Sequence, residues 1–154
     1  MHTSFLRPGI AGALLFIALI TLPSEAIAEA PKPGRDMILV RPTNKTPDQV
    51  ADAVKAYAEK NSWVFLGANK VKKGEITLVK VCIPAVGQTI WGVGLELSAL
   101  LPCGNLSVYQ KEGRTEISML DPRYMQVLYP HPEVEKASEA ATTQLTAMLD
   151  SVAK

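Results

Sequence analysis

Cysteine and histidine are scarce in this chain of 154 residues, which contains two of each. Two cysteines exclude a four-cysteine zinc site, and two histidines leave little for acid–base catalysis. The sequence also contains no G-x-S-x-G turn, no HExxH helix and no G-x-x-x-x-G-K-[ST] loop. These motifs are the local signatures of common enzyme classes. The sequence therefore favours a noncatalytic protein.

An excess of charge of either sign is also missing. The chain has 16 Lys and Arg against 15 Asp and Glu, so its formal net charge is +1. Nucleic-acid binding usually requires a dense basic field, and no run of like charges here exceeds a pair. We therefore expect no nucleic-acid partner. The length allows a single domain.

A hydrophobic run long enough to cross a membrane is the third absence. The apolar run from Ile10 to Leu22 follows Arg7 and is shorter than the roughly 20 residues of a spanning helix. Ala26-Ile27-Ala28 then supplies small residues where signal peptidase cleaves. The pattern predicts a cleaved signal peptide over residues 1–28, with an uncleaved membrane anchor as the alternative.

Export determines the expected organisation and chemistry of the mature chain. We expect a periplasmic or secreted protein, not bound to the membrane after cleavage, with a Pro-rich linker over residues 29–35 and one domain over residues 36–154. Of the two histidines, only His131 remains after cleavage. Both cysteines would lie in a compartment that oxidises thiols.

Three helices are predicted from capping signals and apolar spacing. Thr46-Pro47-Asp48-Gln49 combines a capping box with Pro at the first helical position, and Asn61-Ser62 ends that helix. A short helix is expected over residues 86–91, followed by a loop. The last helix begins at Pro132, and its predicted buried stripe has spacings of three and four: Val134, Ala137, Ala141, Leu145, Met148 and Val152.

Strands are predicted where apolar residues alternate or form short runs between turn residues. The segments 105–110 and 115–120 flank Lys111-Glu112-Gly113-Arg114, which is a strong hairpin signal. In the strand over 76–83, Thr77, Val79, Val81 and Ile83 share one face. The full set of expected strands is 37–40, 63–66, 76–83, 105–110 and 115–120.

The order of these elements predicts the fold class. One strand and a helix are followed by two strands, a short helix, two strands and a final helix (β-α-β-β-α-β-β-α). Hairpins dominate, and a regular βαβ alternation is not sustained. We therefore expect an α+β domain with two layers, in which a mostly antiparallel sheet has helices packed on one face.

Several motifs along residues 37–152 resemble those of one known family. They are Val81-Cys82-Ile83-Pro84, Leu101-Pro102-Cys103, Val108-Tyr109 with the Glu112-Gly113 turn, and Ile117 with Asp121-Pro122 and Met125. This pattern resembles the domain-of-unknown-function family 302. The resemblance implies a small two-layer α+β domain that pairs into dimers. It identifies neither a substrate nor a cofactor.

Cys82 and Cys103 are the only pair in the sequence that could carry chemistry. An even count in an oxidising compartment, at two strand ends, is typical of a structural disulfide. Two separately buried thiols and a redox pair are the alternatives. A further alternative is a soft metal or haem site that recruits Met119, Met125 or His131.

Two functions follow as hypotheses. The first is a noncatalytic ligand- or partner-binding module, in which the apolar segment Ala85–Leu101 lines a groove or a homodimer face. Trp91, Tyr109 and Met119 are its candidate groove residues. The second is a redox or metal-handling protein that uses Cys82 and Cys103.

The first testable prediction concerns export. The mature protein should begin at Glu29, or at Pro31 if the second small-residue site, Ala28-Glu29-Ala30, is used. Intact-mass measurement on protein from the periplasmic fraction checks this. A membrane-bound product that retains residues 1–28 would contradict it.

Overall fold

The computed structural model describes residues 34–103 and 106–154 of the chain. The expected signal peptide, 1–28, lies outside the described residues, as does most of the expected linker. Five strands form one antiparallel sheet in the order β1-β5-β4-β3-β2. Their bounds are β1 Ile38–Thr43, β2 Val64–Val71, β3 Ile76–Cys82, β4 Leu106–Lys111 and β5 Arg114–Leu120.

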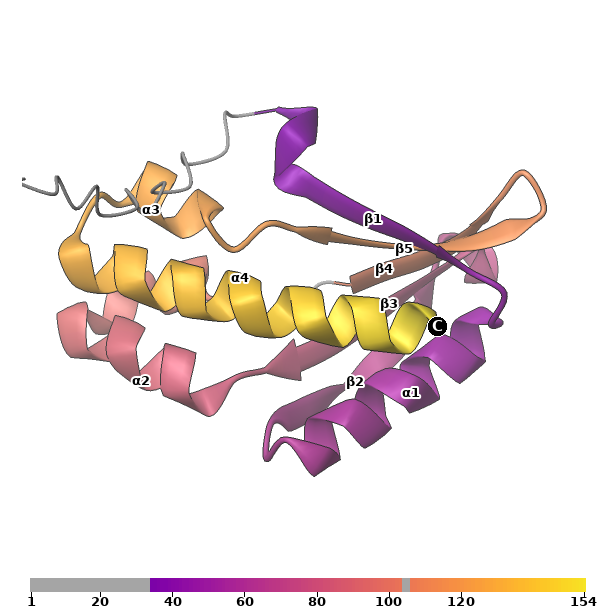
Figure 1. The fold of residues 1–154 in the computed structure, drawn as a ribbon, viewed down its shortest axis with the longest axis horizontal. Coiled ribbons are helices and arrows are strands. Elements are labelled where there is room, and N and C mark those ends of the chain that lie inside the picture. Colours follow the sequence, from indigo (N-terminus) through magenta and orange to yellow (C-terminus); the bar gives the residue numbers. More distant parts are fainter. Residues whose placement is uncertain (1–33, 104–105) are drawn as a thin grey trace, which may run out of the picture.

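The helices form a second layer over one face of this sheet (Figure 1). The long helix α4, Pro132–Ala153, runs across the sheet, and α1, Pro47–Lys60, lies beside it. Helix α2, Pro84–Val93, packs against α4, and the short α3, Tyr124–Leu128, precedes α4. The described residues also contain three 3-10 turns, η1 Arg35–Met37, η2 Lys72–Gly74 and η3 Leu95–Leu100. The predicted α+β fold is confirmed.

Alternation along the strands places the core between the two layers. Thr77, Val79 and Val81 of β3 are buried, whereas Leu78 between them is partly exposed and Lys80 is exposed. Strand β5 repeats this pattern. The predicted stripe of α4 is buried against the same core, with Leu149 and Ser138 added to it. On the opposite face of the sheet, the strand side chains remain partly or fully exposed.

Local signals fix the first helix and the second hairpin as predicted. The Thr46 hydroxyl accepts a hydrogen bond from the Gln49 backbone N–H at 3.3 Å, and the Thr46 N–H donates to Gln49 Oε1 at 2.8 Å. In the β4–β5 turn, Glu112 and Gly113 have φ of 50° and 78°. Two consecutive positive φ angles are typical of the tight turns that match strand twist.

Two strands extend beyond the expected bounds. Strand β1 continues through Pro42 to Thr43, because an edge strand tolerates a residue without an N–H. Strand β2 continues through Gly67 to Val71, because a bulge between Phe65 and Gly67 absorbs the extra residue Leu66. Gly67 has a φ of 121°, a backbone angle that residues with a side chain rarely adopt.

The segments around residues 84–100 and 121–128 are more helical than expected. The short helix predicted over 86–91 spans Pro84–Val93, and the expected loop after it contains η3. Helix α3 was not predicted; it follows the expected turn at Asp121, where the Arg123 N–H donates to Asp121 Oδ1 at 2.9 Å. Among the described residues, no helix combines the length and the apolar character needed to cross a membrane.

Asp121 joins several elements in the interior. Its carboxylate is fully buried and accepts hydrogen bonds from the Arg123 guanidinium, at 2.6 Å for the shortest, and from Thr142 of α4. Its N–H donates to the Met37 carbonyl at 2.7 Å, which attaches η1 to the end of β5. Burial raises the pKa of Asp121, but the hydrogen bonds and charge of Arg123, with the Thr142 hydrogen bond, lower it below its usual value.

A second prediction follows from this ion pair. Asp121→Asn should lower the free energy of unfolding by about 2–4 kcal/mol near neutral pH, because it leaves Arg123 without its counter-charge. The lowered pKa means that the ionised form of Asp121 stabilises the fold above the unfolded pKa of about 3.9. This stabilisation is lost as pH falls through the folded pKa, so wild type should lose more stability on acidification than the variant.

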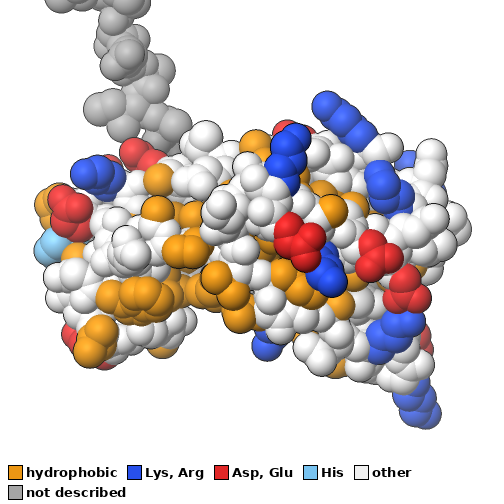
Figure 2. All heavy atoms as spheres, turned by 90° about the horizontal axis from the view of Figure 1, so that it is seen from below, with side chains coloured by type: hydrophobic (Ala, Val, Ile, Leu, Met, Phe, Trp, Pro, Cys, Tyr) orange, Lys and Arg blue, Asp and Glu red, His pale blue; other side chains and the backbone are white. Residues whose placement is uncertain are grey.

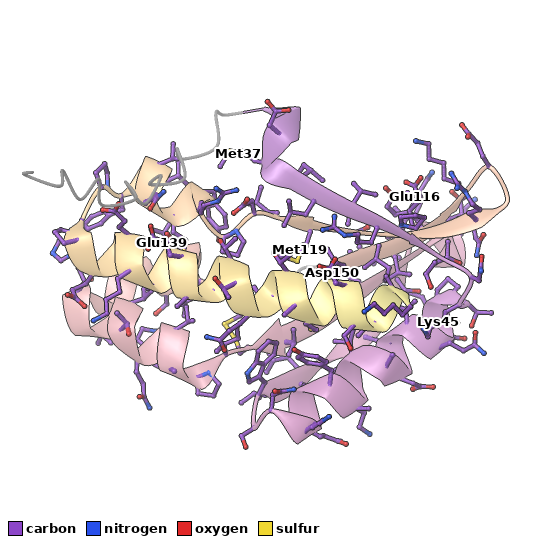
Figure 3. The ribbon with its side chains drawn as sticks, viewed as in Figure 1. Met37, Lys45, Glu116, Met119, Glu139 and Asp150 are labelled. Atoms are coloured by element: carbon purple, nitrogen blue, oxygen red, sulfur yellow. A yellow bond between two sulfur atoms is a disulfide. The ribbon has the colours of Figure 1, made fainter. Side chains whose placement is uncertain are left out.

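Denaturant titrations at several pH values measure this difference. Asp150→Asn is the matched control, because Asp150 pairs with Arg41 at 2.7 Å on the surface (labelled in Figure 3). An exposed pair is worth at most about 1 kcal/mol. Equal losses in the two variants would contradict the prediction.

Candidate functional site

The candidate site lies at the end of the sheet where the described part of the central strand, β4, begins. The described β3–β4 ladder reaches the pair Val79–Leu106, and β3 continues to Cys82. Strand β5 also continues, to Leu120, beyond the last β4 pair at Ser118. At this end of the sheet, the chain before β4 is neither helix nor strand from Leu101 to Cys103. We call residues 101–103 the wall segment.

A cavity of about 70 Å³ lies beside the wall segment. Met119 reaches it from β5, between the sheet and α4 (Figure 3), and Leu145 reaches it from α4. Apart from the Tyr124 hydroxyl, the side chains around it are apolar. Its lining residues are Val81, Leu101, Pro102, Leu106, Met119, Leu120, Tyr124 and Leu145.

The wall segment is attached to the domain at both ends. At its start, the Leu101 N–H donates to the Ser98 carbonyl at 3.2 Å. The Tyr124 hydroxyl donates a hydrogen bond to the neighbouring Leu100 carbonyl. Burial raises the pKa of Tyr124, which keeps the phenol protonated as a donor near neutral pH. At its end, Cys103 is bonded to Cys82.

The Cys82–Cys103 disulfide continues the β3–β4 register beyond the last ladder pair. Cys82 lies three residues after Val79, and Cys103 lies three residues before Leu106. The register of the ladder therefore places the two cysteines opposite each other. Their Cα atoms are 4.3 Å apart. The expectation of a disulfide is confirmed, and separately buried thiols are excluded. Both cysteines are partly exposed; the bond lies below α4 (Figure 3).

The three predicted groove residues do not meet in one site. Met119 lines the cavity. Trp91 lies on α2 with 44% of its surface exposed, and its indole N–H donates to the Ser98 hydroxyl at 2.8 Å. Tyr109 lies on the uncovered sheet face, where its hydroxyl donates to Glu116 at 3.0 Å. Partial burial and this neighbouring carboxylate raise the pKa of Tyr109.

Of the five predicted metal-ligating residues, Cys82 and Cys103 are bonded to each other, and Met119 lines the cavity. Met125 is fully buried in the core. His131 caps α4, with its Nδ1 accepting from the Glu133 N–H at 3.2 Å. Two sulfurs bonded to each other offer no thiolate, so a site using Cys82 and Cys103 would require their reduction. In residues 34–103 and 106–154, no three His, Cys, Asp or Glu residues are grouped as metal ligands.

Sequence reasoning missed Pro102, Tyr124 and Leu145 as site residues. Leu145 was predicted only as part of the buried stripe of α4, and Pro102 only as part of a motif with Cys103. The signals that marked this place were Cys103, a predicted site residue, and Leu101, the last residue of the predicted groove segment. Tyr124 follows a turn and belongs to a helix that the sequence pattern did not predict.

A solved structure shares this fold. The structure described as that of an uncharacterized conserved protein DUF302 from Bacillus stearothermophilus is similar, with a TM-score of 0.68 and 18% sequence identity. The match covers 77% of this chain and 98% of that one. No curated protein matches the chain. The family described as Domain of unknown function DUF302 matches residues 40–152, and the chain belongs to it.

A third prediction concerns the contribution of the disulfide to stability. Cys103→Ser should lower the free energy of unfolding by about 2–4 kcal/mol, because the bridge closes a loop that is open in the unfolded variant. The double variant Cys82→Ser/Cys103→Ser should lose about the same amount, since one bond is lost in both. Chemical denaturation under nonreducing conditions measures both values. A loss in the double variant equal to twice the single loss would contradict the assignment.

Proposed function

We propose that this protein is an exported, noncatalytic module that binds a small apolar molecule, or the apolar end of a larger one. The observation that carries this proposal is the cavity beside the wall segment. Removing apolar surface from water is worth about 25 cal/mol per Å². No charged side chain lines the cavity among the described residues, so the proposed occupant is neutral there.

The size of the cavity limits what enters it. An apolar cavity of about 150 Å³ holds benzene or xenon in another protein, and it stays dry when empty. The cavity here is about half that volume. It therefore suits a group of a few heavy atoms, and affinity for a longer ligand would come from contacts outside the cavity.

Xenon is the probe for a fourth prediction. In protein labelled with ¹³C at the methionine methyl groups, xenon should shift the Met119 resonance. Met125 and Met148 should not respond, because both are buried but neither lines the cavity. Leu145→Phe should reduce the Met119 response at least about fivefold by filling the cavity, provided that the surroundings accommodate the ring. Met119→Leu should remain stable, because the swap nearly conserves volume.

The pattern of responses decides the proposal. A xenon shift confined to Met119, and lost in a folded Leu145→Phe protein, supports it. No shift at any methionine, or equal shifts at Met119 and Met125, would contradict a ligand cavity here. Thermal unfolding of Leu145→Phe verifies that the variant is folded when it is measured.

The redox alternative is favoured by a separate observation, the partial exposure of the disulfide. A redox pair would be found in both oxidation states in the periplasm, whereas a structural bridge would remain oxidised. Free-thiol titration of protein from that compartment, with a metal and visible-absorbance scan, separates the two. A bound metal or a haem spectrum would favour the alternative, because free thiols alone would also arise from a bridge that opens reversibly.

We also propose a homodimer, with the segment 85–101 in its interface. The exposed apolar residues Trp91 and Leu95, 44% and 75% exposed, support this proposal. Figure 2 shows the side of the molecule on which α1 and α2 lie: hydrophobic side chains gather in its left and central parts, and many charged ones lie toward the right. A sizeable exposed apolar patch is typical of an interaction surface.

A fifth prediction tests that interface. Leu95→Lys should weaken dimerisation by at least about tenfold, because it brings a charge into an apolar contact. Leu128→Lys is the matched control, since Leu128 of α3 is 66% exposed and lies outside the segment. Sedimentation equilibrium measures both dissociation constants. A monomeric wild type at high micromolar concentration would contradict the dimer, and equal effects of the two variants would contradict this interface.

A further inference from the structure

The wall segment depends on the disulfide in a way that most of the sheet does not. From Ile76 to Val79, β3 is held to β4 by the ladder. Beyond Val79, the described link between β3 and the chain before β4 is the bond from Cys82 to Cys103. A covalent bond therefore stands where backbone hydrogen bonds hold the rest of this strand pair.

The part of the wall segment that lines the cavity lies between the two attachments of this segment. Leu101 and Pro102 line it, and Cys103 follows immediately. The Tyr124–Leu100 hydrogen bond and the Leu101–Ser98 hydrogen bond hold only the start of the segment. Opening the disulfide would leave the start attached and would remove the described attachment of the end.

The disulfide is also accessible to a reagent from solution. Cys82 and Cys103 are both partly exposed, whereas Val81 beside Cys82 is fully buried. Thiol–disulfide exchange requires such access, because a thiolate must attack one of the two sulfurs directly.

We propose that the Cys82–Cys103 disulfide is a redox-controlled latch on the cavity, opened by a dithiol reductant. One thiolate of the dithiol attacks a sulfur of the bridge, the S–S bond breaks, and the leaving sulfur takes up a proton. The second thiolate of the dithiol then displaces the first cysteine, which is also protonated. Two electrons pass to the protein, which gains two thiols, and the reductant becomes a disulfide.

This inference rests on the proposed function, because the latch acts on whatever occupies the cavity. With the bridge closed, the wall segment is fixed at both ends, and exchange of the occupant is slow. With the bridge open, the end of the segment at Cys103 moves away from β3. The occupant then exchanges quickly, while the ladders and the helix layer remain in place.

The test compares xenon exchange in the oxidised and the dithiothreitol-reduced protein by ¹²⁹Xe saturation transfer. Exchange should be at least about tenfold faster after reduction, which corresponds to about 1.4 kcal/mol in the exchange barrier. The double variant Cys82→Ser/Cys103→Ser should exchange quickly and should not respond to dithiothreitol. Tyr109→Phe, which keeps the bridge and changes a residue on the uncovered sheet face, should remain slow when oxidised and become fast on reduction.

Amide hydrogen exchange checks, without a ligand, that reduction releases only the end of the segment. The Leu101 amide, which donates to Ser98 at the attached start, and the Ile117 amide of β5 should lose no more protection on reduction than the stability loss measured for Cys103→Ser accounts for. A larger loss at Leu101 would overturn the latch, because the start would then be released as well. A larger loss at Ile117 would also overturn it, because reduction would then open the sheet.

The outcomes separate the latch from the cavity. Xenon that binds with equal exchange rates in both redox states overturns the latch and leaves the proposed function standing. Xenon that binds in neither state overturns both. Faster exchange on reduction, with Ile117 still protected, supports both.

Discussion

The disulfide between Cys82 and Cys103 is the interaction on which the site depends. The described part of β4 begins at Leu106, whereas β3 continues to Cys82 and β5 continues to Leu120. Beside this end of the sheet, side chains from both layers line the cavity and do not fill it. The wall segment borders the cavity, and the disulfide joins the end of the segment to β3.

The fold could be predicted largely because its signals are local. The capping box at Thr46, the turn at Glu112-Gly113 and the apolar stripe of α4 each depend on residues a few positions apart. The errors in strand bounds have one origin. Pro42 and Gly67 are read as strand breakers in a sequence, but an edge strand and a bulge accommodate them, and strand position is a property of the whole sheet.

The sequence predicted only those residues of the candidate site whose type is rare and chemically distinctive. Cys82 and Cys103 are conspicuous because cysteine is rare in this chain, and their pairing was predicted from an expected oxidising compartment. The cavity has no such mark: Leu101, Met119 and Leu145 meet through the register of strands far apart in the sequence. Trp91 and Tyr109 were expected to line a groove as large aromatic residues, but they lie on two other surfaces.

The two edges of the sheet also bear on how the chain meets other chains. An exposed edge strand offers unpaired N–H and C=O groups to any other chain that comes near. Pro42 removes one donor from β1, the bulge at Gly67 interrupts the regular edge of β2, and Lys70 adds a charge to that edge. Strand-by-strand aggregation is therefore disfavoured at both edges of the sheet.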